Sequence, residues 1–547
     1  SDLEDVNQLY FDHPGLHAEP VTAMKDGKLQ PVPAKFKVTI EPATPLGMHD
    51  VRAVGRYGIS NPRIFVVGDG IEVNETEPNN TPAQAVRVLA DRVPRVTVNG
   101  QINGATDIDQ FRFSARAGQR ILIDCLARRI DSRLDGRLVL LSPSGKQLAG
   151  SDDFKGRDPF LDVTIPADGD YVVGITDQVY DGSPEYFYRL TIGTLPYIDY
   201  VYPPVAVPGA TSQFTLFGRN LPGGQLASSL LVDGRPLEQL KVQIAVPEEP
   251  LSKHRLDYSG RVPARQSMID GFEYRLTTPQ GSSNSVLIGV TDLPVVEAIE
   301  NATPEKAQAV TPPCEICGRF DSPRDFQWFR FNAKANEVWM IESLSQRAGF
   351  PTDLFLTLRR VKDGAEIGTA DDDGTSPIGT RFVISSDDPV LRTPQLAEGE
   401  YLVGVRHLYT AIKPNARLLY RLRIRPVQPD FSLLVLHNAP GQPNAAEQPG
   451  SLLVRRGGNQ HLDVYAVRRD GFNGEIAVKV DGLPAGVTCS PVTLGPGLPG
   501  QPGQIHTPLV FSAANDAPIA TGTLTITGTA TIDGKPVSVA PNTLLVD

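Results

Sequence analysis

Short stretches of alternating apolar and polar residues recur along the whole chain. In residues 121–125, Ile121, Ile123 and Cys125 fall at every second position. In residues 523–532, threonine alternates with leucine, isoleucine, glycine and alanine. Side chains of a β-strand point alternately to its two faces, so this period predicts half-buried strands. Residues 81–91 are the only helix candidate, with Pro82 in the first turn. The pattern predicts an all-β fold.

Composition adds limits to this picture. The 547 residues include 50 glycines and 48 prolines, which suits many strands joined by turns. A single core rarely serves more than ~250–300 residues, so several domains are expected. The net charge is −11, from 52 basic and 63 acidic residues, which argues against a nucleic-acid partner. No apolar run approaches the ~18–20 residues of a membrane span, so no transmembrane segment is expected.

An internal repeat organises the chain. FRFSARAGQRILIDCLA (111–127) resembles FRFNAKANEVWMIESLS (329–345), and GDYVVGI (169–175) resembles GEYLVGV (399–405). The order is kept and the spacing changes only by loop-sized insertions, so one long unit occurs twice. We therefore predict a tandem array of β-sandwiches, Ig-like and jelly-roll-like. Its domains would be residues 1–70 (Ig-like), 71–196 (a second sandwich type), 197–293 (Ig-like), 294–427 (the second type, diverged) and 428–547 (Ig-like).

The repeat also bears on the first domain. When Asn220 and Leu221 are aligned with Asp2 and Leu3, roughly twenty residues of the later copy have no counterpart. We therefore expect the first domain to be truncated at its N-terminus, and the chain to be part of a longer polypeptide or assembly.

The second domain type resembles the bacterial pre-peptidase C-terminal (PPC) domain family. The matching elements are EPNN (77–80), G-x-I (100–102), DIDQFRF (107–113), AGQ (117–119) and GDYVVGI followed by YRLTI. Residues 294–427 match less well, because ENATP replaces EPNN. The first type resembles IPT/TIG-like Ig domains. PPC domains are appended to secreted bacterial proteases and other exported proteins, and some relatives bind calcium. The resemblance implies an extracytoplasmic (secreted, periplasmic or cell-surface) location and an accessory binding role.

Acidic and amide side chains in two short segments form the best candidate site for chemistry. Glu75 and Glu77 are two residues apart, as are Asp107 and Asp109, so each pair would point one way in an extended segment. Ca²⁺ takes six to eight oxygen ligands with flexible geometry. Calcium-binding relatives hold their ions with matching E-x-E-x-N-N and D-x-D elements. Solvated or capping roles remain the alternative. The candidate ligands are Glu75, Glu77, Asn79, Asn80, Asp107 and Asp109.

Other acidic groups make weaker cation candidates. The second copy retains Glu297, Glu300, Asn301 and Asp325. The loops 151–153 and 370–374 are also acidic, but their sequences favour ordinary turns.

Two further candidates carry sulfur or aromatic chemistry. Cys314 and Cys317 lie on a strand or its approach, where side chains three residues apart face opposite sides. A disulfide between them would need a turn in the chain. A disulfide and two free thiols are therefore both open alternatives. Tyr180, Tyr186 and Tyr188 lie near a turn and would either stack on a sugar or peptide ligand or pack in the core.

No hydrolase, phosphate-loop or dinucleotide motif is present, so we expect no enzyme within these residues. The function predicted first is a structural, adhesive or polymer-binding envelope component, with Ca²⁺ as a candidate stiffening ion. Its partners would be a polysaccharide, a protein polymer or other envelope proteins. The alternative is a set of accessory domains from a larger secreted protease or other hydrolase, with the catalytic domain outside this chain.

Overall fold

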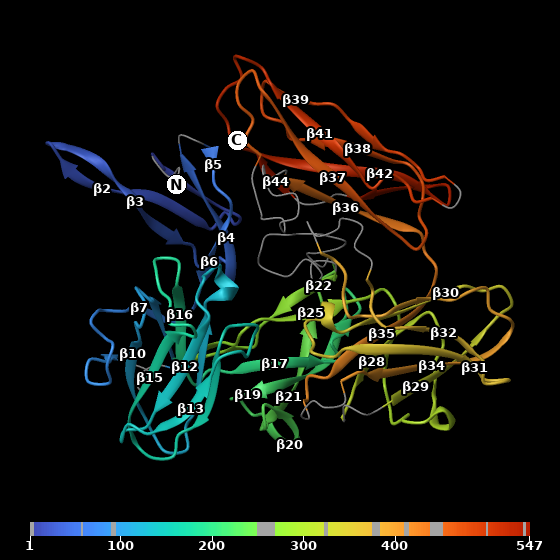
Figure 1. Ribbon diagram of the computed structural model, residues 1–547, viewed down its shortest axis with the longest axis horizontal. Helices are drawn as coiled ribbons and strands as arrows, with labels where there is room; N and C mark the ends of the chain where they lie inside the picture. The colour runs from blue at the N-terminus through green and yellow to red at the C-terminus, as the bar shows by residue number, and fades with distance from the viewer. Residues whose placement is uncertain are drawn as a thin grey trace.

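The computed structural model describes residues 5–55, 58–88, 94–248, 269–321, 326–374, 383–409, 415–437, 452–498, 501–539 and 543–546. In these ranges the chain forms β-strands grouped into small sheets (Figure 1). The helices of the described part are single 3₁₀ turns: η1 (Arg128–Ile130), η3 (Pro304–Lys306) and η4 (Gln346–Ala348). The all-β fold predicted from the sequence is confirmed.

The helix predicted at residues 81–91 is wrong over its described part. Residues 81–84 form a turn, in which the Thr81 hydroxyl donates to Gln84 Oε1 at 2.7 Å. Val86 and Arg87 then form strand β8 (Val86–Arg87), which pairs in parallel with β10 (Asp109–Ala115). Residues 89–91 lie outside the described residues. Pairing with a neighbouring strand outweighs the weak local preference for a helix.

The second sandwich, β7–β16, holds the candidate metal ligands. Its two five-stranded sheets have the orders β13-β12-β15-β10-β8 and β14-β11-β16-β9-β7. They enclose a core that includes Phe111, Phe113 and Tyr171. The strands not yet given are β7 (Ile71–Asn74), β9 (Arg95–Gln101), β11 (Arg120–Leu126), β12 (Gly136–Leu141), β13 (Gln147–Ser151), β14 (Phe160–Thr164), β15 (Gly169–Asp177) and β16 (Phe187–Gly193).

The fourth sandwich, β26–β35, repeats this topology strand for strand. Its sheets have the orders β32-β31-β34-β29-β27 and β33-β30-β35-β28-β26. Phe329, Phe331 and Tyr401 occupy its core. The strands are β26 (Val295–Glu297), β27 (Gln308–Ala309), β28 (Cys314–Arg319), β29 (Phe326–Ala333), β30 (Trp339–Leu344), β31 (Leu354–Arg360), β32 (Glu366–Ala370), β33 (Val390–Arg392), β34 (Gly399–His407) and β35 (Leu419–Pro426). The shared order gives residue-by-residue equivalents between the two sandwiches.

The remaining strands form three smaller units. In the first unit, β1 (Gln8–Phe11), β4 (Gly47–Gly55), β5 (Gly58–Ile59) and β6 (Arg63–Val67) make one sheet, and β2 (Leu16–Lys25) pairs with β3 (Lys28–Ile40). The third unit contains β17 (Tyr197–Tyr202), β18 (Val205–Ala206), β19 (Thr211–Arg219), β20 (Gln225–Val232), β21 (Arg235–Ala245), β22 (Gly271–Tyr274), β23 (Thr277–Thr278), β24 (Gly281–Ser282) and β25 (Val286–Val290).

The fifth unit has two sheets, of orders β36-β37-β41-β39 and β40-β38-β42-β43, with β44 paired to β42. Its strands are β36 (Asp430–His437), β37 (Asn459–Arg469), β38 (Ile476–Asp481), β39 (Val487–Cys489), β40 (Val492–Leu494), β41 (His506–Ala513), β42 (Gly522–Ile532), β43 (Lys535–Val539) and β44 (Thr543–Val546). The five boundaries drawn from the sequence stay a prediction. Among the described residues, no helix is long and apolar enough to cross a membrane.

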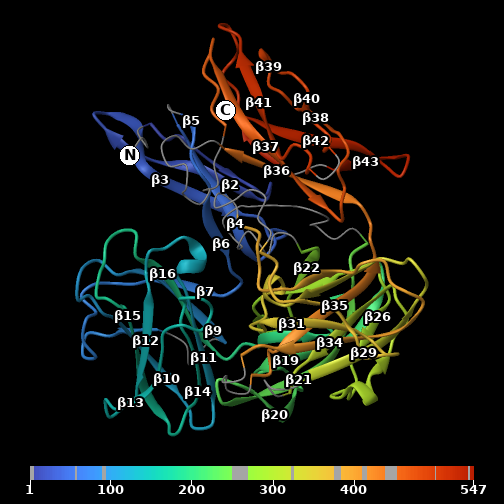
Figure 2. The ribbon, with the colours of Figure 1, turned by 45° about the vertical axis from the view of Figure 1, so that its right-hand side comes forward.

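The third unit lies between the second and fourth sandwiches and contacts both (Figure 2). Arg120 of β11 donates to Glu238 of β21 at 2.9 Å. Buried Arg219 of β19 lies 3.4 Å from Asp162 of β14, and its guanidinium is 5.0 Å from the centre of the Phe160 ring. These charge and aromatic contacts join the third unit to the second sandwich.

Candidate metal centre

The candidate ligands gather at one end of the second sandwich, where three segments meet. Glu75 and Glu77 follow β7, and Asp107 and Asp109 precede or open β10. Carboxylate oxygens of Glu77, Asp107 and Asp109 lie within 4.8 Å of one another. Two oxygens on one Ca²⁺ at 2.3–2.6 Å lie at most about 5 Å apart, so this spacing fits a single calcium ion.

Glu75 joins the cluster through Tyr188 on β16. The Tyr188 hydroxyl lies 2.6 Å from Asp109 Oδ2 and 3.1 Å from Glu75 Oε2. The other oxygen of Glu75 accepts the Gln101 backbone N–H at 2.7 Å. Gly100 is opposite Tyr188 in the sheet, and a Cβ there would collide with the Tyr188 ring and the Glu75 carboxylate. The glycine of the G-x-I element therefore makes room for the Tyr188–Glu75 contact.

Backbone and amide donors hold the loops around the cluster. Asn103 donates its backbone N–H to Asp107 Oδ2 at 2.7 Å and its side-chain amide to Glu77 Oε1 at 3.2 Å. Asn80 Oδ1 accepts the Ile108 backbone N–H at 3.1 Å, so Asn80 braces the loop. These bonds bring the 75–80 segment and the 103–109 loop together without a cation.

Two members of the cluster are buried and lack partners for some of their polar atoms. Asp109 and Asn79 are both 0% exposed. Among the residues that the structure describes, Oδ1 of Asp109 and both side-chain polar atoms of Asn79 have no hydrogen-bond partner. A buried polar atom without a partner costs about 1–3 kcal/mol, so such atoms are rare unless a ligand satisfies them. This donor set, all oxygen with one amide, suits Ca²⁺.

The charges of the cluster also favour a bound cation. Burial and the neighbouring Glu75 and Asp107 raise the pKa of Asp109 to about 9. Burial and Glu77 raise the pKa of Glu75 as well. Without a cation, Asp109 therefore keeps its proton near neutral pH. A bound cation would favour the ionised carboxylate and displace that proton.

The fourth sandwich lacks the same constellation. Tyr420 lies opposite Gly318, as Tyr188 lies opposite Gly100, but its hydroxyl donates to the amide oxygen of Gln327. Gln327 stands where the second sandwich has Asp109. The backbone N–H of Ala298 bonds to β28 as that of Glu75 bonds to β9, so Ala298 replaces Glu75.

The prediction that Glu297, Glu300, Asn301 and Asp325 form a weaker cation site in this copy is corrected in part. Glu297 pairs with Cys317 in the ladder and is the counterpart of Asn74, so it does not replace Glu75. Glu300 is exposed and forms an ion pair with Lys306 at 3.3 Å. Asn301 is buried, and its side-chain amide donates to the Trp328 backbone oxygen at 2.8 Å. Asp325 lies outside the described residues.

A second acidic group lies at the 370–374 loop. Carboxylate oxygens of Asp353, Asp371 and Asp372 lie within 4.8 Å of one another, and Asp371 and Asp372 are exposed. Burial, with the nearby Asp387, Asp372 and Asp371, raises the pKa of Asp353 to about 6. At the equivalent place in the second sandwich, Arg157 lies 3.1 Å from Asp135.

Both cysteine candidates and two of the three tyrosine candidates are buried. Cys314 and Cys317 lie on the continuous strand β28 as free thiols, so the possible disulfide is not formed. Tyr186 and Tyr188 are buried in the core of the second sandwich, because they alternate in phase with Leu190 and Ile192. They are therefore not a stacking surface. Tyr180 is 51% exposed and keeps that possibility.

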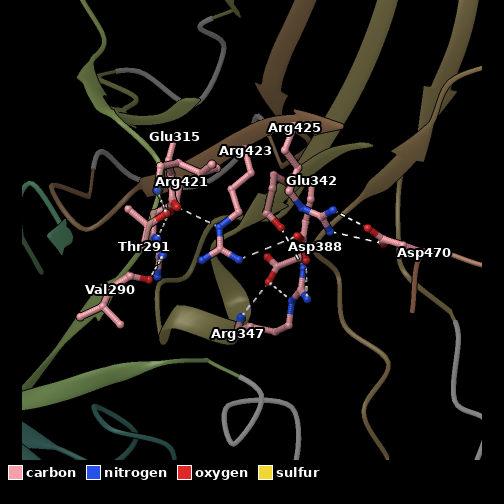
Figure 3. Close-up of polar contacts among 12 residues, drawn as sticks. Val290, Thr291, Glu315, Glu342, Arg347, Asp388, Arg421, Arg423, Arg425 and Asp470 are labelled. Carbon is pink, nitrogen blue, oxygen red and sulfur yellow. Dashed lines mark hydrogen bonds and ion pairs between the residues drawn. The ribbon is translucent and has the colours of Figure 1, made fainter. Parts of the chain in front are cut away.

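The sequence analysis missed a ladder of arginines on β35. Arg421, Arg423 and Arg425 alternate along this strand and face one side of the sheet (Figure 3). Arg421 and Arg423 both bind Glu315 of β28, and Arg425 binds Asp470 at the end of β37. Arg347 contacts Glu342 at 3.1 Å and Asp388 at 3.0 Å (Figure 3). The alternation in YRLRIRP was the available signal.

This ladder joins three units. Arg421 also donates to the Val290 backbone oxygen of the third unit at 3.4 Å, and Asp470 belongs to the fifth. Burial alone would raise the pKa of Glu315, but Arg421 and Arg423 hold it at about 2. A cavity of about 730 Å³ beside the ladder is lined by residues of all three units, such as Asp292, Glu342 and Arg469. Its lining mixes both charges, as expected for an ion-paired joint.

Comparisons with known proteins match only parts of the chain. No protein-family model matches it. It is 34% identical over 119 residues to a probable subtilase-type serine protease of Deinococcus radiodurans, a match that covers 21% of this chain and 16% of the protease. The chain thus spans about a sixth of the length of that curated relative.

Two solved structures are similar to about a fifth of the chain. One is the pre-peptidase C-terminal domain of a collagenase from Bacillus anthracis, at 17% identity and a TM-score of 0.17; the match covers 22% of this chain and 99% of that domain. The other is PliG of Aeromonas hydrophila, a periplasmic inhibitor of g-type lysozyme, at 15% identity and the same TM-score of 0.17, covering 22% of this chain and 96% of that protein.

Proposed function

We propose that the chain is a calcium-binding, non-catalytic accessory region of a secreted protease or other exported hydrolase. The observation that carries the calcium part is the group of Glu77, Asp107 and Asp109 beside polar atoms of Asp109 and Asn79 that are buried without partners. The match to a subtilase-type protease supports the accessory role over the adhesive one. The adhesive role stays a prediction, because no observation on this structure favours it.

Calcium would act here as a structural ion. It would neutralise carboxylates drawn from the end of β7 and the start of β10, and so stiffen the connection between the first unit and the second sandwich. Glu77, Asp107 and Asp109 would be the ligands, with the unpartnered side-chain oxygen of Asn79 available beside them. Tyr188 would hold Asp109 and Glu75 in place from behind.

Terbium luminescence and thermal melting of the whole chain test this proposal. Tb³⁺ is an oxygen-seeking stand-in for Ca²⁺, and excitation of the adjacent Tyr188 should sensitise its emission. We expect emission that Ca²⁺ competes away, and a melting temperature that Ca²⁺ raises and a chelator lowers. Asp109→Gln, which copies Gln327 of the fourth sandwich, should abolish both effects.

The matched control is the double variant Asp371→Asn and Asp372→Asn at the other acidic group, which should retain both effects. If Ca²⁺ shifts neither the melting temperature nor the terbium emission of the wild type, the calcium part is wrong. The accessory part is tested separately, by whether the full gene product carries a hydrolase domain whose activity is unchanged when Asp109→Gln is introduced.

A further inference from the structure

The hairpin formed by β2 and β3 is a long two-stranded ribbon outside the main sheet of the first unit. Its ladder runs from Leu16 opposite Ile40 to Lys25 opposite Lys28, interrupted by a bulge near Val21. Within the described part of the chain, its two strands pair only with each other. In both views the ribbon projects away from the rest of the molecule (Figures 1 and 2).

The ribbon has one apolar face and one polar face on which lysines outnumber acidic residues. Side chains in register with Met24 lie on the apolar face, and those in register with Lys25 lie on the other. The apolar face carries Leu16, Ala18, Pro20, Thr22 and Met24 on β2 and Leu29, Pro31, Phe36, Val38 and Ile40 on β3. The opposite face carries Lys25 and Lys28 as a pair beside the turn and Lys37 opposite Glu19, with Lys35 in the bulge.

The base of the apolar face is covered and its tip is not. Leu16, Ala18 and Val38 pack in the core of the first unit. Met24 and Leu29, a cross-strand pair beside the turn, are 67% and 69% exposed. Two large apolar side chains exposed as a pair at the tip of a projecting ribbon are typical of a surface that contacts another partner.

The edges of the ribbon do not favour addition of a further strand. Pro20 on β2 and Pro31 and Pro33 on β3 lack backbone N–H donors, and Ala34 adopts a φ of 55° in the bulge. Prolines and bulges are devices that block edge-to-edge pairing. Any partner therefore meets the apolar face and the lysines around it, and not the backbone edge.

The charge of the ribbon indicates which kind of partner it would bind. Residues 16–40 contain four lysines, one glutamate and one aspartate, which gives this segment a net charge of +2. The whole chain has a net charge of −11, so the net charge of all other residues is −13. We propose that the tip of this ribbon binds an anionic lipid surface. Met24 and Leu29 would enter the interface, while the lysine stems would extend to the phosphates. Repulsion of the acidic remainder would limit contact to the projecting tip.

Vesicle flotation of the full chain tests this inference. We expect binding to vesicles of equal parts phosphatidylglycerol and phosphatidylcholine at low salt, and none to phosphatidylcholine alone. Charge reversal in Lys25→Glu with Lys28→Glu should weaken binding by at least roughly fivefold for each lysine. Met24→Asp with Leu29→Asp should abolish it. Leu226→Asp, at a 65% exposed leucine of β20, is the matched control and should bind as the wild type does.

A second readout separates binding from a folding defect. Because Trp328 and Trp339 lie elsewhere, Leu29→Trp reports on the tip, and its emission should shift to the blue with anionic vesicles only. Absence of wild-type flotation overturns the proposal. It is also overturned if the wild type dimerises without lipid and Met24→Asp with Leu29→Asp is monomeric, because the tip would then bind a second copy.

Discussion

The second and fourth sandwiches share one strand order but differ in the side chains at two places, one end of the sandwich and the outer face of one sheet. The second places four carboxylates near the end of β7, two of them against Tyr188, and leaves Oδ1 of Asp109 without a partner among the described residues. Within the same described part, the side-chain oxygens of Asn79 and of its counterpart Asn301 are unpartnered in both copies. The fourth places Gln327 and Ala298 at the same positions, and there Tyr420 donates to a neutral amide. An oxygen cluster that suits a cation has thus been replaced by a neutral hydrogen bond.

The outer face of the sheet that contains β9 or β28 carries ion pairs in both copies, and Arg189, the counterpart of Arg421, binds Glu72 at 2.6 Å. The copies differ there at one buried position. In the second sandwich, Thr97 and Thr191 face each other there with their hydroxyls 3.0 Å apart. In the fourth, Glu315 replaces Thr97 and binds Arg421 and Arg423. Ion pairs also join the second sandwich to the third unit, through Arg120 and Arg219. The scaffold thus carries ion-paired joints in both copies, and a handful of substitutions give the second its candidate ion site and the fourth its buried Glu315.

The largest expected effect comes from breaking the joint. Glu315→Ala leaves Arg421, 1% exposed, without its carboxylate partner, and should destabilise β28 and β35 by about 3–5 kcal/mol. Thr97→Ala, the equivalent change in the second sandwich, should cost only about 1 kcal/mol. Hydrogen exchange of the amides of β28 and β9 measures both. Equal losses in the two variants would show that the ion pairs do not distinguish the copies.

The next largest effect is expected when the ion site of the second sandwich is built into the fourth. Ala298→Glu with Gln327→Asp gives the fourth sandwich counterparts of Glu75 and Asp109. Without calcium, the added buried carboxylates should destabilise the fourth sandwich by about 3 kcal/mol. Calcium should restore part of this loss, visible as hydrogen-exchange protection of β26 and β29. The control Ala298→Gln should show no calcium response, and a double variant that ignores calcium would mean that other residues define the site.

The sequence predicted the all-β class and the gathering of the acidic segments, because both follow from periodicity and local spacing. For Tyr188 the sequence left ligand stacking and core packing both open, although its alternation with Leu190 and Ile192 was a signal for the core. Its contact with Glu75 and Asp109 depends on the pairing of β16 with β9, which no local pattern encodes.

The equivalence of Glu297 and Glu75 failed for a similar reason. The second copy has no residue that corresponds to Pro78. In the alignment of the two copies, the segment before this point is therefore offset by one residue relative to the segment after it. A shift of one residue moves a side chain to the other face of a strand. Only the register of β26 against β28 shows that Ala298, and not Glu297, occupies the place of Glu75.

The two copies should also respond to pH with opposite signs. The pKa of Asp109 is raised to about 9 from 3.8, so the metal-free fold holds an extra proton and loses stability as pH rises between these values. The pKa of Glu315 is lowered to about 2 from 4.5, so its contribution is present above pH 4.5 and is lost as pH falls toward 2.

Thermal melts in chelator measure both slopes. Relative to Asp109→Asn, the wild type should lose melting temperature as pH rises from 5 to 8. Relative to Glu315→Gln, its advantage should shrink as pH falls below 4.5. Parallel pH profiles for the wild type and both variants would contradict the assignment of these charges.

The smallest effect is a proton count. Because burial beside Glu75 and Asp107 raises the pKa of Asp109 to about 9, calcium binding at pH 7 should release about one proton. Titration calorimetry in two buffers of different ionisation enthalpy measures this number. The release should fall to about half as pH approaches 9, since Asp109 is then half ionised before calcium arrives. If the binding enthalpy at pH 7 does not depend on the buffer, no proton is released and the ion does not bind at Asp109. The difference between Asp109 in the second sandwich and Gln327 in the fourth would then have no effect on calcium binding.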